Sequence, residues 1–296
     1  MWFPWSLAAL ASTSVAGIVD SIVAYRYRAS SPTILWSLGL WKAAGILLLF
    51  LTTDVRSAWA PVLLCTGVVY YAGIWLYFLT LRSIDASVVT VSLASQTAIL
   101  TTISLALGDR FSWFQGAGIA CTAASLFFLI RRLPAIGLRE SAFLLGLSVI
   151  FVPDVVAKKL AIAGGETNSA VLFWSLVSTT ILSLAVPLLL PRLRGELLQT
   201  MRRTHGSFWM FCGLLVVLLF FTLFANLRAY ATGPLALIAA VDTVRPFTIL
   251  LFAWCVAVLK PAWAPRESFE PGAVRVKIAG FALAFVGLLL LAPWQL

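Results

Sequence analysis

The sequence predicts an all-α membrane protein with ten transmembrane helices, and three observations lead to this prediction. Of the 296 residues, 61% are hydrophobic and only 11% are charged, whereas a soluble domain is about 45–50% apolar and about 25% charged. The apolar residues form long runs, and one membrane-spanning helix needs about 20 of them. These runs are apolar on all sides rather than striped, as expected of helices in lipid. This pattern excludes a soluble enzyme, a disordered chain and a nucleic-acid-binding domain.

Ten apolar segments follow one another along the chain, and most of the connections between them are short. Residues 146–152 do not alternate in polarity, which argues against the strands of a transmembrane barrel. Two connections are longer, over 191–206 and 259–277, and we expect both to be loops. The expected spans are Trp5–Tyr25, Thr33–Thr52, Trp59–Leu81, Ala86–Leu107, Phe111–Ile130, Ser141–Ile162, Asn168–Leu190, Phe208–Leu227, Pro234–Val258 and Ile278–Pro293.

The positive charges are unevenly distributed over these connections. When each connection is numbered by the span that it follows, the odd ones hold 14 Lys and Arg and the even ones, with the adjoining end of the sixth span, hold 5. Lys and Arg gather on the cytoplasmic side, so the sequence predicts a multi-pass protein of the cell (inner or plasma) membrane with both termini outside. The odd set is Arg26, Arg28, Arg82, Arg131, Arg132, Arg139, Arg192, Arg194, Arg202, Arg203, Lys260, Arg266, Arg275 and Lys277; the even set is Arg56, Arg110, Lys158, Lys159 and Arg228.

The second half of the chain repeats features of the first half in the same order. The matched pairs are Ile18–Asp20 with Val152–Asp154, Leu35–Ser37 with Phe173–Ser175, Leu81–Arg82 with Leu227–Arg228, and Gln96 with Asp242. The repeat divides the chain into two five-helix units, 1–132 and 139–296. Because five is odd, the second unit is inserted upside down relative to the first. Inverted repeats of this kind place a substrate site near the membrane midplane, which predicts a secondary transporter.

Three stretches carry motifs of a known family. They are Tyr77-Phe78-Leu79-Thr80-Leu81-Arg82-Ser83-Ile84-Asp85-Ala86-Ser87, then Gly108-Asp109-Arg110-Phe111-Ser112 ahead of Gly116 to Leu129, and Asn226-Leu227-Arg228-Ala229-Tyr230 in the second unit. On these residues the chain resembles the ten-helix, EamA-type members of the drug/metabolite transporter (DMT) superfamily. It departs from the family pattern at Asp109, where the family has Glu, and over 260–277, where the second such motif is replaced by a longer connection.

This resemblance has implications for fold, substrate and orientation. It implies a basket of ten helices in two inverted EamA-like units. It also implies the movement of small polar metabolites such as amino acids. The family usually has cytoplasmic termini, which is opposite to the orientation that the Lys/Arg count predicts.

Five ionisable residues inside expected spans are site candidates, because a charge at membrane depth costs at least a few kcal/mol. They are Asp20, Lys42, Asp154, Asp242 and Arg245. We expect Lys42 and Arg245 to line a midplane cavity and bind an anionic group, because a guanidinium suits a carboxylate or phosphate. Asp242 is then a counter-ion or proton carrier.

Asp242 and Arg245 are three residues apart and therefore share one helical face. Pro246 removes a backbone hydrogen bond, so we expect the helix to open there and expose carbonyl groups to the cavity. Gln96, the repeat partner of Asp242, is a further candidate for substrate binding. The alternative is that Asp242 and Arg245 form a locked pair that only holds helices together.

Asp20 and Asp154 occupy equivalent places in the two units and are candidates for a coupling or a structural charge. Asp154 has Lys158 four residues later, which is a local partner in a helix. Eight aromatic residues are candidate cavity walls that stack on the substrate, namely Trp36, Trp41, Tyr70, Tyr71, Trp75, Tyr77, Trp174 and Trp254. Tyr71, Trp75 and Trp174 are the ones selected as site residues, because Tyr71 and Trp75 share one helical face and Trp174 lies in the repeat. Packing between neighbouring helices is the alternative for all eight.

The predicted function is secondary active transport of a small polar metabolite, an amino acid or a similar compound, by alternating access. The alternative is a translocase, or flippase, for a lipid-linked or phosphorylated headgroup. An enclosed cavity of mixed charge favours the first, and a lateral slot lined by Arg and Lys favours the second. The sequence holds no GxxxxGK[ST], HExxH or GxSxG motif, so neither direct ATP use nor an enzyme is expected.

The sequence predicts neither a cofactor nor a metal. All four cysteines fall inside expected spans without a CxxC motif, and the single histidine, His205, lies in a basic connection. The expected partners are a small-molecule substrate and the lipid bilayer, with protons as a candidate coupling ion and no nucleic acid. The protein is expected to be a monomer or a homodimer.

Overall fold

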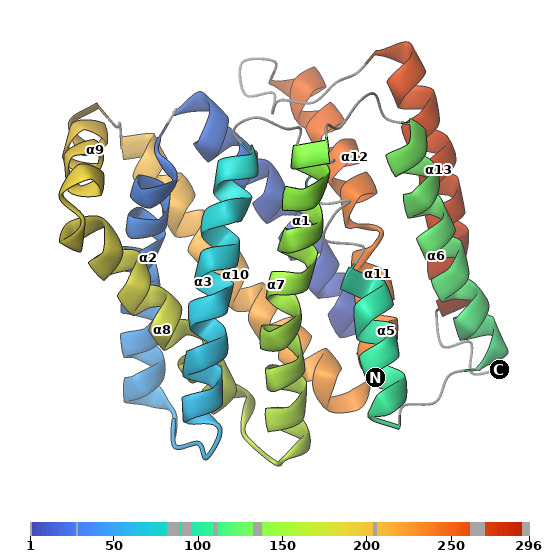
Figure 1. Cartoon of the computed structure of the whole chain (residues 1–296), viewed down its shortest axis with the longest axis horizontal. Helices are drawn as coiled ribbons and strands as arrows, with labels where there is room; N and C mark the ends of the chain where they lie inside the picture. Colours follow the sequence, from blue (N-terminus) through green and yellow to red (C-terminus); the bar gives the residue numbers. More distant parts are fainter. Residues whose placement is uncertain are drawn as a thin grey trace.

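The computed structural model describes residues 2–27, 29–81, 89, 96–108, 112–132, 138–203, 206–260 and 270–291, and every regular element in these ranges is a helix (Figure 1). The expectation of an all-α protein is therefore confirmed. The helices are α1 (Trp2–Arg26), α2 (Ser31–Thr52), α3 (Ala60–Leu81), α5 (Gln96–Ala106), α6 (Trp113–Arg132), α7 (Leu138–Ala163), α8 (Asn168–Leu189), α9 (Pro191–Arg203), α10 (Gly206–Thr232), α11 (Leu235–Asp242), α12 (Arg245–Leu259) and α13 (Pro271–Leu291).

Six helical segments in the described ranges are long and apolar enough to cross a membrane. They are α1, α2, α3, α8, α10 and the segment Leu235–Leu259, which contains α11 and α12. On α2, Leu47, Leu48 and Leu51 are 59%, 63% and 71% exposed, as expected of side chains that face lipid. These features support an all-α membrane protein.

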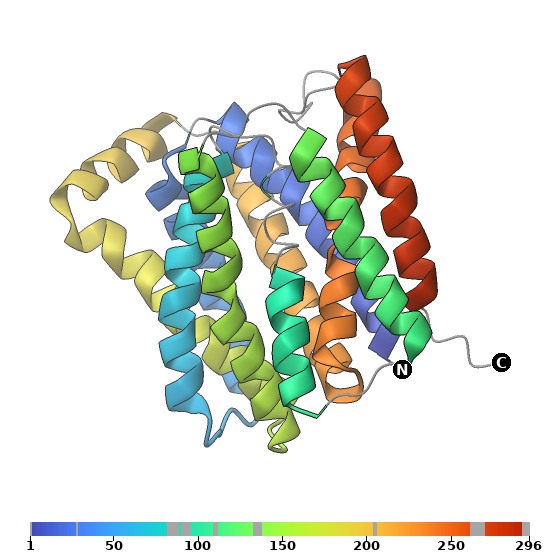
Figure 2. The same ribbon diagram turned by 45° about the vertical axis from the view of Figure 1, so that its right-hand side comes forward.

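The helices form a bundle in which elements distant in the sequence pack side by side (Figures 1 and 2). α1 packs on α10 and α12, α2 on α8, and α3 on both α7 and α8. α5 packs on α11, and α6 packs on α13. Each of these contacts joins the first half of the chain to the second half.

Glycine allows some of these helices to approach closely. A Cβ atom added at Gly39 of α2 would lie 2.9 Å from the Cβ atom of Ser183 on α8. A Cβ atom added at Gly73 of α3 would lie 2.8 Å from the side chains of Ile150 and Phe151 on α7. Small residues at contacts between membrane helices permit this proximity, and dispersion forces then stabilise the pair.

Two expectations about the connections are wrong. The connection expected over 191–206 contains the helix α9, and the one expected over 259–277 ends early, because α13 begins at Pro271. α9 was missed because it is amphipathic and too short to span lipid, so it lacks the uniform apolar character of the other helices. Of the expected fourth span, 86–88 and 90–95 lie outside the described residues, as do Asp109, Arg110 and Phe111 of the second family motif.

The expected ninth span is interrupted, but not where the sequence suggested. α11 ends at Asp242 and α12 begins at Arg245, so the turn lies at Thr243 and Val244, ahead of Pro246. In this turn the Thr243 amide donates to Ala240 O at 3.1 Å and the Val244 amide donates to Val241 O at 3.2 Å. Pro246 instead lies in the first turn of α12, where its missing N–H group costs nothing.

Candidate functional site

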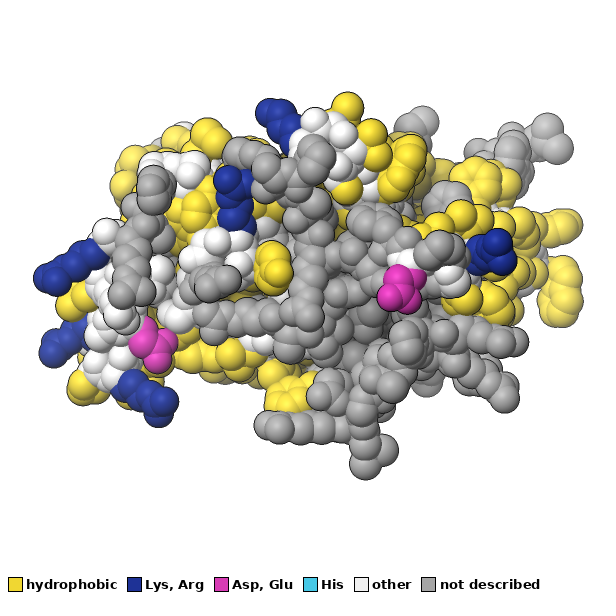
Figure 3. Space-filling view, turned by 90° about the horizontal axis from the view of Figure 1, so that it is seen from above, with side chains coloured by type: hydrophobic (Ala, Val, Ile, Leu, Met, Phe, Trp, Pro, Cys, Tyr) yellow, Lys and Arg dark blue, Asp and Glu magenta, His cyan; other side chains and the backbone are white. Residues whose placement is uncertain are grey.

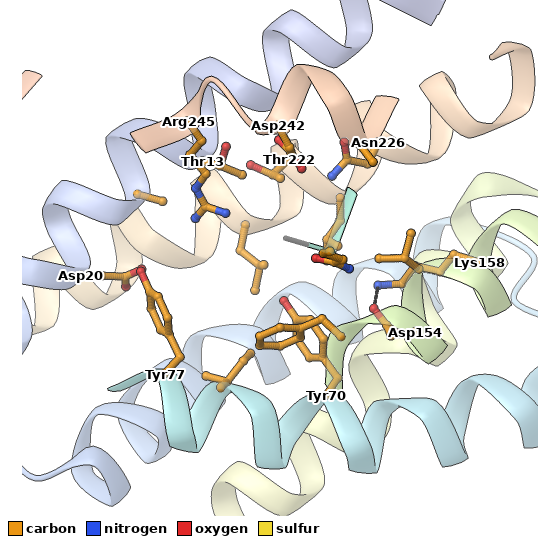
Figure 4. Close-up of a pocket in the computed structure, with 18 of the residues that line it drawn as sticks. Thr13, Asp20, Tyr70, Tyr77, Asp154, Lys158, Thr222, Asn226, Asp242 and Arg245 are labelled. Atoms are coloured by element: carbon orange, nitrogen blue, oxygen red, sulfur yellow. Dashed lines mark hydrogen bonds and ion pairs between the residues drawn. The ribbon is translucent and has the colours of Figure 1, made fainter. Parts of the chain in front are cut away.

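A cavity of about 250 Å³ lies between helices from both halves of the chain (Figure 4). α1, α2, α3 and α5 contribute side chains from the first half, and α7, α10, α11 and α12 contribute them from the second. Apolar groups such as Leu38, Phe151 and Leu219 make up part of the wall. The polar and ionisable lining residues are Thr13, Asp20, Lys42, Tyr70, Tyr77, Gln96, Asp154, Lys158, Thr222, Asn226, Tyr230, Asp242 and Arg245.

Asp20, Tyr77 and Arg245 come together on one side of this cavity (Figure 4). The Tyr77 hydroxyl donates to Asp20 Oδ2 at 3.4 Å, which links α3 to α1. The guanidinium of Arg245 points into the cavity (Figure 4), and its Nε atom is buried with no hydrogen-bond partner among the described residues. Arg245 therefore has donors available for a ligand.

Asp154 and Lys158 form an ion pair in another part of the wall. Lys158 Nζ lies 2.5 Å from Asp154 Oδ2 across one turn of α7, and both residues are buried. Lys158 Nζ also lies 5.3 Å from the centre of the Tyr70 ring, within the range of a cation–π interaction. The second carboxylate oxygen, Asp154 Oδ1, is buried and has no partner among the described residues, so it is an open hydrogen-bond acceptor.

Lys42 differs from Lys158 because no described residue neutralises it. It reaches the cavity from α2 and is only 2% exposed. The described ion pair is Lys158–Asp154, and no hydrogen bond of the Lys42 ammonium is found in the described part of the chain. A buried charge without a partner is costly, so a bound anion would stabilise it.

Asp242 and Arg245 both line the cavity, but they do not form the locked pair that was the alternative expectation. Their side chains make no ion pair with each other, although both residues are described. The turn at Thr243 and Val244 separates them onto two helices. Figure 4 places Asp242 beside Thr222 and Asn226 of α10, while Arg245 extends toward Thr13 and Asp20 of α1.

Six of the expected site residues line the cavity: Asp20, Lys42, Gln96, Asp154, Asp242 and Arg245. Tyr71, Trp75 and Trp174, the aromatic residues selected as site residues, are not among the lining residues. Tyr71 and Trp75 pack edge to face, with ring centres 6.0 Å apart, in and against the core. Trp174 donates from Nε1 to Val55 O at 2.6 Å, at the connection between α2 and α3.

Two of the eight candidate aromatic residues, Tyr70 and Tyr77, line the cavity. Lys158, Thr222 and Asn226 also line it although they were not selected from the sequence, and the spacing of Asp154 and Lys158 was the one signal that pointed to any of these three. Among the described residues, no group of three His, Cys, Asp or Glu side chains could hold a metal ion.

Comparisons with known proteins bear on the fold of this chain. No protein-family model matches it, and no curated protein matches it. Solved structures do match. One of them, described only as "Crystal structure of protein", is 18% identical with a TM-score of 0.54, and the alignment covers 95% of this chain and 92% of that chain. At this identity the likeness shows a shared fold alone.

Proposed function

We propose that the protein is a secondary active transporter that moves a small polar metabolite through this cavity by alternating access. The observation that carries the proposal is the mixed charge of the cavity wall, where Asp20, Asp242, Lys42 and Arg245 converge from four helices. Ionisable residues at membrane depth mark substrate and ion pathways, because placing a charge there costs free energy and such residues are rare unless they have a function. An amino acid or similar compound, with groups of both charges, fits such a wall.

We further propose that the chain forms ten helices in two inverted five-helix units, 1–132 and 139–296. The pairing of the helices supports this arrangement. α1 packs on α10 as α7 packs on α3, and α3 packs on α8 as α10 packs on α2. The pairs α2–α8, α5–α11 and α6–α13 each join equivalent members of the two units. Membership of the DMT superfamily is part of the same proposal and rests on the motif resemblance.

In this mechanism the two units rock about the cavity and open it to one side at a time. Arg245 binds the anionic group of the substrate through its forked donors, and Lys42 adds a second cation. Asp242 or Asp20 receives a cationic group or carries a proton. Because the cavity opens to only one side at a time, movement of the substrate is driven by its own concentration gradient or by the proton gradient.

The orientation in the cell membrane is also a proposal. We place both termini outside, with the odd-numbered connections in the cytoplasm, because Lys and Arg are concentrated in those connections. α9 belongs to one of them and carries Arg192, Arg194 and Arg202. The transporter is a monomer or a homodimer, and it is not an enzyme.

Transport of a substrate tests this proposal most directly. A thermal-shift screen of purified protein against classes of metabolite identifies a ligand, because binding to the folded state raises the melting temperature. Uptake of that ligand is then measured in vesicles. Arg245→Ala is expected to remove most uptake, at least tenfold, while Arg228→Ala on the exposed part of α10 leaves uptake unchanged. Normal uptake by a folded Arg245→Ala variant would contradict the proposed site.

A further inference from the structure

α9 differs from the other helices because its two faces differ in polarity. Leu193, Leu197 and Met201 follow at intervals of four residues, and Leu197 is 1% exposed where α9 packs against α2 and α8. Leu198 borders this apolar face and is 53% exposed. A helix of this kind, too polar to span a membrane, lies in the plane of the membrane interface; here its apolar face packs on α2 and α8, and Leu198 is left exposed beside it.

The arginines of α9 are exposed and carry unneutralised charge. Arg192, Arg194 and Arg202 are all exposed, and none makes an ion pair with a described carboxylate. Glu196 is the only acidic residue in this helix. Seen from above, Lys and Arg side chains project from the left edge of the molecule, where α9 lies in Figure 1 (Figure 3).

The position of α9 brings these arginines to the depth of lipid headgroups. α8 is long enough to cross the membrane, and α9 begins at Pro191, two residues after α8 ends at Leu189. The chain turns at Leu190, whose extended backbone separates the two helices. An anionic leaflet attracts basic residues at this level by about 1 kcal/mol each.

We propose that α9 is an interfacial helix that binds the headgroups of anionic phospholipids through Arg192, Arg194 and Arg202. Guanidinium groups pair with phosphate through parallel hydrogen bonds, and their stems reach past the apolar face to the headgroup layer. Leu198 inserts among the upper acyl carbons. This binding is independent of the cavity and of whatever the cavity carries.

Native mass spectrometry of the purified full-length protein tests the proposal by counting bound lipids. Phosphatidylglycerol and phosphatidylcholine with the same acyl chains are titrated in detergent, and the wild type is expected to bind the anionic lipid more tightly. The variant R194Q/R202Q is expected to lose roughly 30-fold in affinity for phosphatidylglycerol, since two charges are removed. R194K/R202K, which keeps the charges, is expected to retain most of that affinity.

The matched control is R56Q/R228Q, which removes two exposed arginines outside α9, one in the connection between α2 and α3 and one on α10. It is expected to bind phosphatidylglycerol as the wild type does. Equal loss in both double variants, or no loss in R194Q/R202Q, would overturn the proposal. Displacement of the lipid by millimolar inorganic phosphate would also overturn it, because the site would then take a free anion. If R194Q/R202Q fails to fold, the single variant R192Q is expected to lose about 5-fold, and unchanged affinity there would have the same consequence.

Discussion

The charge of Lys42 is not compensated by any described residue of the cavity wall. Lys42 is 2% exposed, and its ammonium has no hydrogen-bond or ion-pair partner in the part of the chain that the structure describes. Lys159 is its opposite, because its ammonium donates to Tyr230 O at 2.9 Å and to Gly233 O at 2.8 Å. Lys159 therefore satisfies carbonyl groups at the end of α10 that the helix itself leaves open.

This contrast predicts different effects on stability. Lys42→Met is expected to leave the melting temperature of the ligand-free protein unchanged or to raise it, because an apolar side chain of similar size removes an uncompensated buried charge. Lys159→Met is expected to lower stability by about 1–3 kcal/mol, since it leaves carbonyl acceptors unsatisfied. Thermal melts in detergent measure both. A destabilisation by Lys42→Met as large as that by Lys159→Met would mean that Lys42 is a structural residue.

At this scale the five charged residues selected from the sequence all line the cavity, whereas the sequence did not separate the aromatic rings that line it from those that do not. An ionisable residue in a membrane helix must face the protein interior or water and not lipid. The side chains of Asp20, Lys42 and Arg245 are therefore expected to point into the bundle. An aromatic ring is stable in the cavity wall, in the core or in lipid, so its type does not fix its direction. Tyr70 lines the cavity and Tyr71 does not, because successive residues point about 100° apart around a helix.

Contacts between helices depend on small residues whose importance is apparent only in three dimensions. Gly39 of α2 faces Ser183 of α8 with no room for a methyl group. Gly146 of α7 has no atom within 4 Å of the position where a Cβ atom would lie. The sequence alone does not distinguish these two glycines, because both lie in apolar helices.

Gly39→Ala is therefore expected to destabilise the protein by about 1–3 kcal/mol, because the added methyl group overpacks the contact between α2 and α8. Gly146→Ala is the matched control and is expected to be neutral or stabilising by up to about 1 kcal/mol, since alanine is the better helix former. Melting temperatures of the two variants, compared with the wild type, measure the effect. Equal melting temperatures would show that α2 and α8 can separate without cost.

α9 and the turn between α11 and α12 show the limits of prediction at the scale of elements. Uniform apolar runs identified the spanning helices, because partition into lipid depends on composition and length. A short amphipathic helix produces no such signal, so the sequence predicts a loop where the structure has α9. Pro246 correctly indicated an interruption, but the turn formed at Thr243 and Val244, because proline is accommodated in the first turn of a helix.

For the whole molecule, the ends of the chain and α9 lie at opposite ends of the bundle. α1 begins at Trp2 and α13 ends at Leu291 at the lower end in Figure 1, whereas α9 is at the upper end. The proposed orientation places the upper end in the cytoplasm. This orientation is inferred from the distribution of Lys and Arg, because the packing of the helices does not distinguish the two sides of the membrane.

A reporter that is active only in the cytoplasm tests this orientation. Fused after Leu296, it is expected to be inactive, and fused after Gln199 in α9, it is expected to be active, because the Lys- and Arg-rich connections stay inside. Cell assays of the two fusions at equal expression measure the difference. The reverse pattern would mean that both termini are cytoplasmic, as in the family that the motifs resemble.

The sequence by itself determined that the chain is helical and apolar over membrane-length segments, and which charged residues lie within them. These properties follow from composition and spacing, which act locally. Only the tertiary structure decided that Asp242 and Arg245 make no ion pair with each other although both line the cavity, that Tyr77 of α3 donates to Asp20 of α1, and that Lys42 has no ion-pair partner among the described residues. Such relations depend on the rotation and depth of each helix against its neighbours, which packing sets for all helices together.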